Sequence, residues 1–207
     1  MRKAVIGGAA AAGAALLGAA AIYYFREKET PGPTYRVLRS EGELEIRSYP
    51  ALTVAETVVQ GPRKRALGEG FRRLADYIFA KSRAGEALPM TVPVLQESAE
   101  HDTPMFFDDT AEGGWRVRFV MPDGRSEENL PDPPAEIELV LVAERRVGAI
   151  RFSGVASDDK LTVHEDLLRG WLTRLGEAPA AEPEYAFYNS PMIPPPLRRC
   201  EVLLPLS

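Results

Sequence analysis

Short runs in which apolar and polar residues alternate constrain the fold of this chain most. Residues 44–49 (LEIRSY), 52–59 (LTVAETVV) and 115–121 (WRVRFVM) follow this pattern. A period of two sends successive side chains to opposite faces of a strand, so one face is buried and the other is wet. The sequence therefore predicts a protein built mainly on antiparallel sheet.

Two segments have helical spacing instead. Residues 62–81 begin with Pro62, are followed by Gly85, and place apolar residues every three or four positions. A second helix is expected to begin at the cap Ser157 and to end at Gly176. The apolar positions expected to pack on the sheet are Leu67, Phe71, Leu74 and Ile78 in the first helix, and Leu161, Leu168, Leu172 and Leu175 in the second.

The second half of the chain repeats the order of the first. Residues 136–143 and 147–154 are expected to form a strand pair, and strands over 185–189 and 200–206 follow the second helix. Two phrases also recur. PMTVPV (89–94) resembles SPMIPPP (190–196), and RFVMP (118–122) resembles EVLLP (201–205). We expect an α+β fold: a twisted antiparallel β-barrel of two similar strand-strand-helix-strand-strand halves with two flanking helices, and a ligand groove between the halves.

An apolar segment precedes this body. Arg2 and Lys3 are followed by an uncharged run, Ala4–Phe25, long enough to cross about 30 Å of hydrocarbon. An uncleaved membrane anchor, a cleaved signal peptide and a soluble Ala-rich helix all fit it. The aromatic residues 23–25 favour the anchor, with the domain outside the cytoplasm, whereas cleavage would give a periplasmic or secreted domain. Residues 1–29 are assigned to this N-terminal helical segment and residues 30–207 to one domain.

Composition excludes several classes of function. The formal net charge is −5, and no stretch combines Lys and Arg with aromatic residues, so nucleic acid is not expected as a partner. Cys200 is the single cysteine, which excludes an internal disulfide. The sequence has two histidines and no nucleophile elbow, P-loop or metal-binding His pair, so we expect no enzymatic activity and no bound metal ion outside a cofactor.

Several single residues allow two interpretations. His164 lies on the apolar face of the second helix, where it is a boundary residue or an axial haem ligand. Met90 and Met192 occupy matching places in the recurring phrases and are expected in the core, although a thioether also ligates haem iron. Trp115, Trp171 and Cys200 are expected to be buried. Arg198 and Arg199 either flank a strand or pair with ligand carboxylates.

Five stretches together resemble the SOUL haem-binding family. They are GFRRLADYIFAKSR…LPMTVPV (70–94), WRVRFVMP (115–122), NLPDPP (129–134), AIRFSG (149–154) and YAFYNSPMIPPPLRRCEVLL (185–204). The resemblance implies a twisted β-barrel of two similar halves, distantly similar to ligand-binding domains of certain bacterial transcription regulators. It also implies non-covalent, non-enzymatic binding of haem or another tetrapyrrole.

The family's proposed haem contacts are altered here. Ser48 stands where some members carry a candidate axial His, and Gly68, Asp76 and Ile193 align with basic residues proposed to meet the haem propionates. Arg65, Arg72, Arg198 and Arg199 remain as propionate partners. The predicted ligand-binding residues are Arg65, Phe71, Arg72, Tyr77, Phe119, Tyr188, Arg198, Arg199 and Glu201, with His164 as the candidate axial ligand.

Two rival functions use part of the same set. A different small apolar or cationic ligand would occupy a groove lined by Tyr77, Phe119, Tyr188 and Glu201. An enzyme would instead need Glu201, Tyr188 and His164 in one cleft, within hydrogen-bond reach of one substrate.

Overall fold

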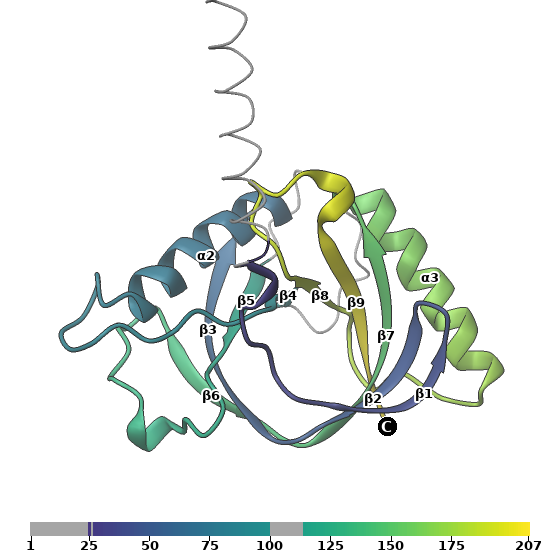
Figure 1. Cartoon of the computed structure of the whole chain (residues 1–207), viewed down its shortest axis with the longest axis horizontal. Helices are drawn as coiled ribbons and strands as arrows, with labels where there is room; N and C mark the ends of the chain where they lie inside the picture. Colours follow the sequence, from purple (N-terminus) through teal and green to yellow (C-terminus); the bar gives the residue numbers. More distant parts are fainter. Residues whose placement is uncertain (1–24, 26, 100–113) are drawn as a thin grey trace, which may run out of the picture.

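A curled sheet with two helices on its outside forms the body of the protein (Figure 1). The structure, a computed structural model, describes Phe25, residues 27–99 and residues 114–207. Within these ranges nine strands form one sheet in the order β1-β2-β7-β9-β8-β4-β5-β3-β6, and every neighbouring pair is antiparallel. The strands are β1 (Arg36–Glu41), β2 (Leu44–Tyr49), β3 (Leu52–Gln60), β4 (Val94–Ser98), β5 (Gly114–Val120), β6 (Glu138–Val142), β7 (Arg145–Ser153), β8 (Glu184–Phe187) and β9 (Arg199–Leu206).

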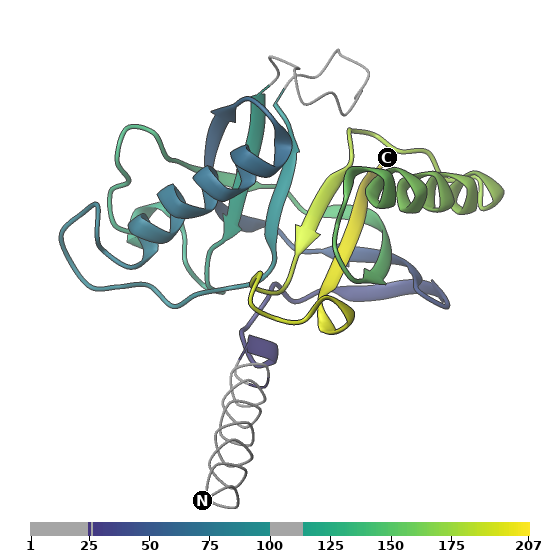
Figure 2. The ribbon, with the colours of Figure 1, turned by 90° about the horizontal axis from the view of Figure 1, so that it is seen from above.

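Helices α2 (Arg63–Ile78) and α3 (Asp158–Arg174) cover the convex face of the sheet on opposite sides (Figure 2). Each has a core cluster of its own. Leu74 and Ile78 of α2 pack with Phe119 of β5, whereas Leu168 and Leu172 of α3 pack with strands β7 and β9. The two helices were predicted, and this part of the α+β prediction is confirmed. Leu74, Ile78, Leu161, Leu168 and Leu172 are buried as expected, whereas Phe71 is 41% exposed, so its assignment to the buried stripe is wrong.

The concave face carries a third apolar cluster, to which neither helix contributes. Val54, Leu95, Val147, Ala149 and Leu203 are among its buried members. They alternate along their strands with the residues that face the helices, as a period of two requires. Charged side chains flank this apolar cluster on both sides.

A short segment rich in Pro and Gly closes part of the concave face. Residues 30–35, here called the crossing segment, run in front of the sheet before β1 begins (Figure 1). The amide N of Val92 donates a hydrogen bond of 2.9 Å to the carbonyl of Pro31. A Cβ on Gly32 would lie 2.6 Å from the carbonyl oxygen of Val92, so only glycine permits this approach. The crossing segment is therefore a packed part of the domain.

The predicted pairing of residues 136–143 with 147–154 is wrong. β6 pairs with β3, and β7 pairs with β2 and β9. Two residues separate β6 from β7, as in a hairpin, but the chain continues across the bottom of the sheet to its other half (Figure 1). β2 and β3 are likewise consecutive without pairing with each other. β1 and β4 are strands that the alternation did not indicate.

The recurring phrases have unequal outcomes. RFVMP and EVLLP begin within β5 and β9, which follow β4 and β8 respectively, so they hold matching places. PMTVPV leads into β4 and ends at its first residue, Val94, whereas SPMIPPP follows β8, so the prediction that Met90 and Met192 are equivalent is wrong. Met192 is also 80% exposed, which contradicts its assignment to the core, because it lies in a surface loop and not on a strand.

The predicted membrane segment falls almost entirely outside the described residues, which include only Phe25 of it. Among the helices that the structure does describe, none has the length and apolar character needed to span a membrane.

Candidate functional site: a cationic cavity on the concave face

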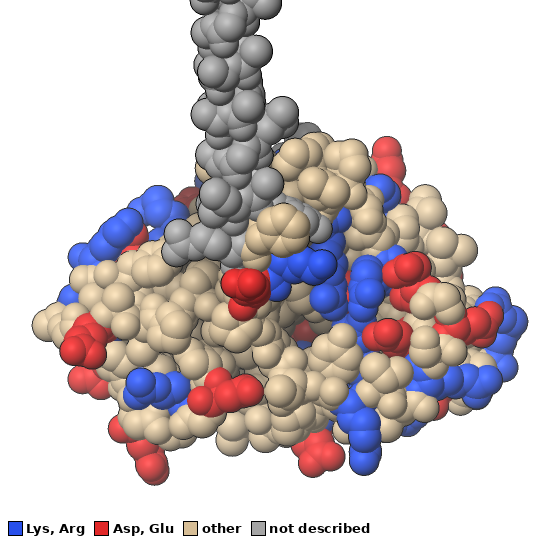
Figure 3. Space-filling model, in the orientation of Figure 1, with Lys and Arg blue, Asp and Glu red and all other residues tan. Residues whose placement is uncertain are grey.

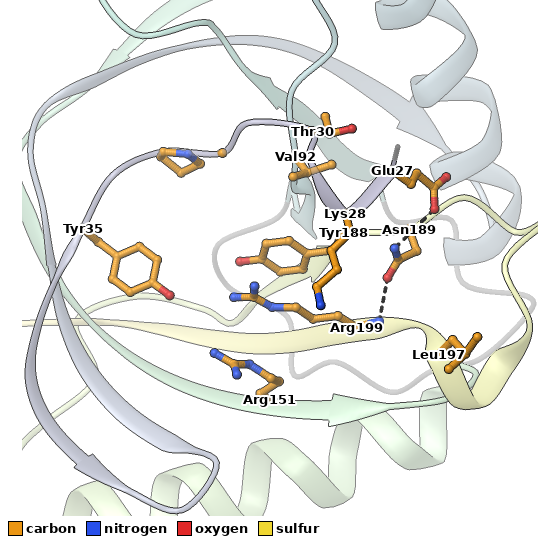
Figure 4. A pocket seen from close by; sticks show the side chains of 12 residues that line it. Glu27, Lys28, Thr30, Tyr35, Val92, Arg151, Tyr188, Asn189, Leu197 and Arg199 are labelled. Atoms are coloured by element: carbon orange, nitrogen blue, oxygen red, sulfur yellow. Dashed lines mark hydrogen bonds between the residues drawn. The ribbon is translucent and has the colours of Figure 1, made fainter. Parts of the chain in front are cut away.

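A cavity of about 450 Å³ opens on the concave side, where the crossing segment passes over strands β7, β8 and β9 (Figure 4). This volume is within the range of sites that hold small molecules and cofactors. Two groups of residues form its wall. Glu27, Lys28 and Tyr35 come from the chain before β1, and Arg151, Tyr188 and Arg199 come from the sheet side.

Arg199 and Tyr188 form the innermost part of the wall. The guanidinium carbon of Arg199 lies 3.9 Å from the centroid of the Tyr188 ring, a cation–π contact. Both side chains also bind Glu201. Nη2 of Arg199 donates to its Oε1 at 2.7 Å, and the Tyr188 hydroxyl donates to its Oε2 at 2.9 Å. The pair is therefore held in one orientation by a carboxylate behind it.

Glu201 lies beneath the cavity floor with a fully buried side chain, and so does its main partner Arg47. Two hydrogen bonds, of 2.7 and 3.1 Å, join the Arg47 guanidinium to the two carboxylate oxygens. Burial alone would raise the pKa of Glu201, but the hydrogen bonds and charges of Arg47 and Arg199 outweigh it and lower the pKa to about 2. Tyr35 covers the pair, with its ring centroid 4.5 Å from the Arg47 guanidinium.

The cavity wall carries an excess of positive charge. Arg47 and Arg199 bind the carboxylate of Glu201, and Nε of Arg151 lies 3.4 Å from its Oε1. Three guanidiniums therefore surround one carboxylate. Lys28 adds a further cation to the wall, while the carboxylate of Glu27 is occupied by Asn189 and Ser190. Figure 3 shows Lys and Arg atoms gathered around the hollow. This arrangement suits a ligand that brings its own negative charge.

The other half of the concave face is closed by ion pairs. Oxygens of Glu56, Glu97 and Glu184 lie within 3.2 Å of guanidinium nitrogens of Arg116, Arg118 and Arg145. Three acids meet three bases, so the cluster is balanced. The space beside it, between Arg118 and Arg145, has a volume of about 20 Å³, enough for about one water molecule.

Three of the predicted ligand-binding residues come together in this site: Tyr188, Arg199 and Glu201. Arg198 is adjacent in sequence, but its guanidinium donates to the carbonyls of Ile193 and Pro191 and supports the loop before β9. The remaining residues lie on the convex side of the sheet: Arg65, Phe71, Arg72 and Tyr77 on α2, and Phe119 beneath it.

The predicted groove that joins Tyr77 and Phe119 to Tyr188 and Glu201 is therefore wrong, because these pairs face opposite sides of the sheet. Both aromatic rings are in the core beneath α2, and the Tyr77 hydroxyl donates to the carbonyl of Pro131 at 2.6 Å.

His164 also lies away from the cavity, on α3. Its Nδ1 is 2.6 Å from the carbonyl oxygen of Lys160, and its ring stacks on Phe152 with centroids 4.2 Å apart. It occupies the boundary position that the sequence indicated, on the other face of the sheet from Tyr188 and Glu201. Trp171 and Cys200 are buried in the same region, as predicted.

The residues of the site that were not predicted include Lys28, Tyr35, Arg47 and Arg151. Arg47 and Arg151 stand at polar positions of alternating strands, which the period of two assigns to a wet face. Nothing in the alternation indicates that another segment covers that face. Tyr35 precedes the alternating strands, so their pattern gives no prediction for it.

Comparison with known proteins identifies the family. A sequence profile described as "SOUL heme-binding protein" matches residues 30–205. The chain belongs to this family. The match includes the crossing segment and the nine described strands, except for the last residue of β9, Leu206. No curated protein matches the chain.

Solved structures resemble the SOUL domain in fold. An uncharacterized conserved protein from Listeria innocua has a TM-score of 0.58 at 16% identity, over 80% of this chain and 92% of its own. The EcmrR C-terminal domain has a TM-score of 0.59 at 12% identity, over 84% and 98%. A structure described as a hydrolase from Listeria innocua has a TM-score of 0.55 at 16% identity, over 82% and 94%. At these identities the likeness concerns the fold alone.

Proposed function

We propose that this SOUL domain binds haem or another tetrapyrrole, without covalent attachment and without catalysing a reaction, in the cavity on its concave face. The observation that carries the proposal is the wall of the cavity. It sets the guanidiniums of Arg151 and Arg199 beside the rings of Tyr35 and Tyr188, in a chain of the SOUL heme-binding protein family.

A tetrapyrrole is a flat apolar ring with carboxylates along one edge, and the wall offers a partner for each part. Arginine binds carboxylates in a planar, two-pronged geometry. Aromatic rings contribute apolar surface that the macrocycle would remove from water. Of the described residues that line the cavity, none is His, Met or Cys. Tyrosine is the residue type of the wall that ligates haem iron elsewhere, and Tyr35 is the candidate, because the Tyr188 hydroxyl donates to Glu201.

The protonation states of the site support binding without catalysis. A general acid or base works best with a pKa near the working pH. The pKa of Glu201 is lowered to about 2, and burial together with the charge of Glu201 raises the pKa of Tyr188 well above its ordinary value. Both groups therefore keep one protonation state near neutral pH.

The charge of the wall also bears on the alternative ligands. A cationic ligand would need a free carboxylate, and that of Glu201 is already engaged by arginines. A second candidate function is therefore the binding of a different small molecule that bears a carboxylate.

For the chain as a whole, we propose that residues 4–25 hold the domain at a membrane, with the domain outside the cytoplasm.

Titration of the full chain with haemin, followed by the shift of the Soret band, tests the proposal. We expect saturable binding, and about a tenfold weaker affinity in Arg151→Gln, since the loss of one charge-assisted hydrogen bond costs about 1.5 kcal/mol or more. Arg169→Gln is the matched control, because Arg169 pairs with Glu165 on the outside of α3. Binding no stronger than that of an unrelated acidic protein, or equal affinities in the two variants, would refute the proposed site.

A further inference from the structure

The loop between β8 and β9 presents apolar side chains to the outside. Met192 is 80% exposed, the highest value among the large hydrophobic side chains that the structure describes, and Leu197 is 49% exposed. Pro194, Pro195 and Pro196 between them are exposed as well. Single exposed apolar residues are common on soluble proteins, but contiguous ones mark contact surfaces.

Contacts within the loop hold it in this shape. Ile193 points inward and is 2% exposed. The Arg198 guanidinium donates to the carbonyls of Pro191 and Ile193, on both sides of Met192. These contacts therefore hold the Met192 side chain in an outward orientation. Exposure of this apolar side chain to water does not itself stabilise the loop.

The same loop is attached to the chain just after the apolar N-terminal run. The carboxylate of Glu27 accepts hydrogen bonds from the amide N of Ser190 at 2.9 Å and from Nδ2 of Asn189 at 3.3 Å. Phe25, the last residue of the uncharged run that starts at Ala4, is 60% exposed. Because consecutive Cα atoms are about 3.8 Å apart, Phe25 lies within about 8 Å of Glu27.

We infer that Phe25, Met192 and Leu197, here called the apolar rim, rest on a lipid surface. This inference rests on the proposed membrane segment. Where residues 4–25 enter a bilayer, the β8–β9 loop must lie close to the bilayer surface, because Glu27, which binds the loop, is only two residues beyond Phe25. Exposed Met, Leu and Phe side chains gain free energy when they leave water for the boundary between headgroups and acyl chains.

The rim borders the cavity. Leu197 belongs to both, and Glu27, Lys28 and Asn189 complete the wall on this side. A ligand that partitions into the membrane would therefore meet the cavity at the lipid surface without crossing bulk water. This deepens the proposed function by naming the source from which the domain takes an amphiphilic, carboxylate-bearing ligand.

Spin labels on the full chain in phospholipid vesicles test the rim. Met192→Cys carries one label, and Leu141→Cys on β6, 72% exposed and at the edge of the sheet, is the matched control. Cys200 does not compete for label, because it is buried and burial raises the pKa of its thiol to about 11. Collisions of each label with oxygen, which concentrates in lipid, and with a water-soluble nickel chelate report its surroundings.

We expect the label at position 192 to collide severalfold more with oxygen, relative to nickel, than the label at position 141. Equal, water-like ratios at the two positions would overturn the inference, as would shielding of position 192 from both reagents, which would mean that protein covers it. Haemin titration of the same labelled chains separates the two proposals. Saturable haemin binding with a water-like label at position 192 would refute the lipid contact alone.

Discussion

Arg47 and Glu201 form a fully buried ion pair on the concave face, joined by hydrogen bonds of 2.7 and 3.1 Å. They come from β2 and β9, strands on either side of β7 that do not pair with each other. Their partners are unequal. Arg47 has a second acid, Glu45, at 2.7 Å, whereas Glu201 balances Arg47, Arg151 and Arg199 together. The carboxylate is therefore the centre of the network.

This asymmetry predicts which half of the pair matters more for stability. Glu201→Leu leaves three guanidiniums without their shared acid and should lower the free energy of unfolding by about 3 to 5 kcal/mol, as for a broken buried pair. Arg47→Met should cost less, because Arg199 and Arg151 still neutralise Glu201. Urea unfolding of both variants and of the double variant measures the order. A double variant as unstable as the sum of the two single ones would contradict the network.

Acid should remove the contribution of Glu201 to stability. The pKa of this carboxyl is about 2 in the folded protein, below its ordinary value of about 4.5 in the unfolded chain. The stabilisation is therefore complete above about pH 4.5 and is lost as the pH falls toward 2. Between pH 5 and pH 2 the wild type should lose on the order of 3 kcal/mol more than Glu201→Gln. Parallel losses in the two proteins would show that Glu201 titrates normally.

The alternation of apolar and polar residues predicted much of the fold but little of the site. β2, β3 and β5 were found because their buried faces are apolar. Arg47 was not found, because a polar residue on an alternating strand is expected to face water. Here the crossing segment covers it through Tyr35, a long-range contact that no local pattern contains.

Strand pairing failed for a related reason. The two-residue connections Pro50–Ala51 and Ala143–Glu144 have the length of hairpin turns, but each passes from one half of the sheet to the other.

The internal duplication stays a prediction. The order β3-α2-β4-β5 recurs as β7-α3-β8-β9, which agrees with it, whereas the displaced PMTVPV and SPMIPPP phrases do not.

Two glycines in α2 should respond oppositely to alanine. A Cβ on Gly68 meets nothing within 4 Å, so Gly68→Ala should stabilise the protein by up to about 1 kcal/mol through helix propensity. A Cβ on Gly70 would lie 2.6 Å from Cγ2 of the buried Val117, so Gly70→Ala should destabilise it by about 1 to 3 kcal/mol despite the same propensity gain. Midpoints of thermal unfolding compare them. Stabilisation by both substitutions would mean that α2 packs less closely on β5.

The crossing segment should control how long a ligand stays in the cavity, because it forms the outer wall. Gly32→Ala places a Cβ 2.6 Å from the carbonyl oxygen of Val92 and must push the segment away from the sheet. Thr34→Ala, at an exposed position of the same segment, is the control. Haem loss to an excess of a haem-free globin should be severalfold faster in Gly32→Ala than in the wild type, and unchanged in Thr34→Ala. Equal rates in all three proteins would place the bound haem away from the crossing segment, and so outside the cavity proposed to hold it.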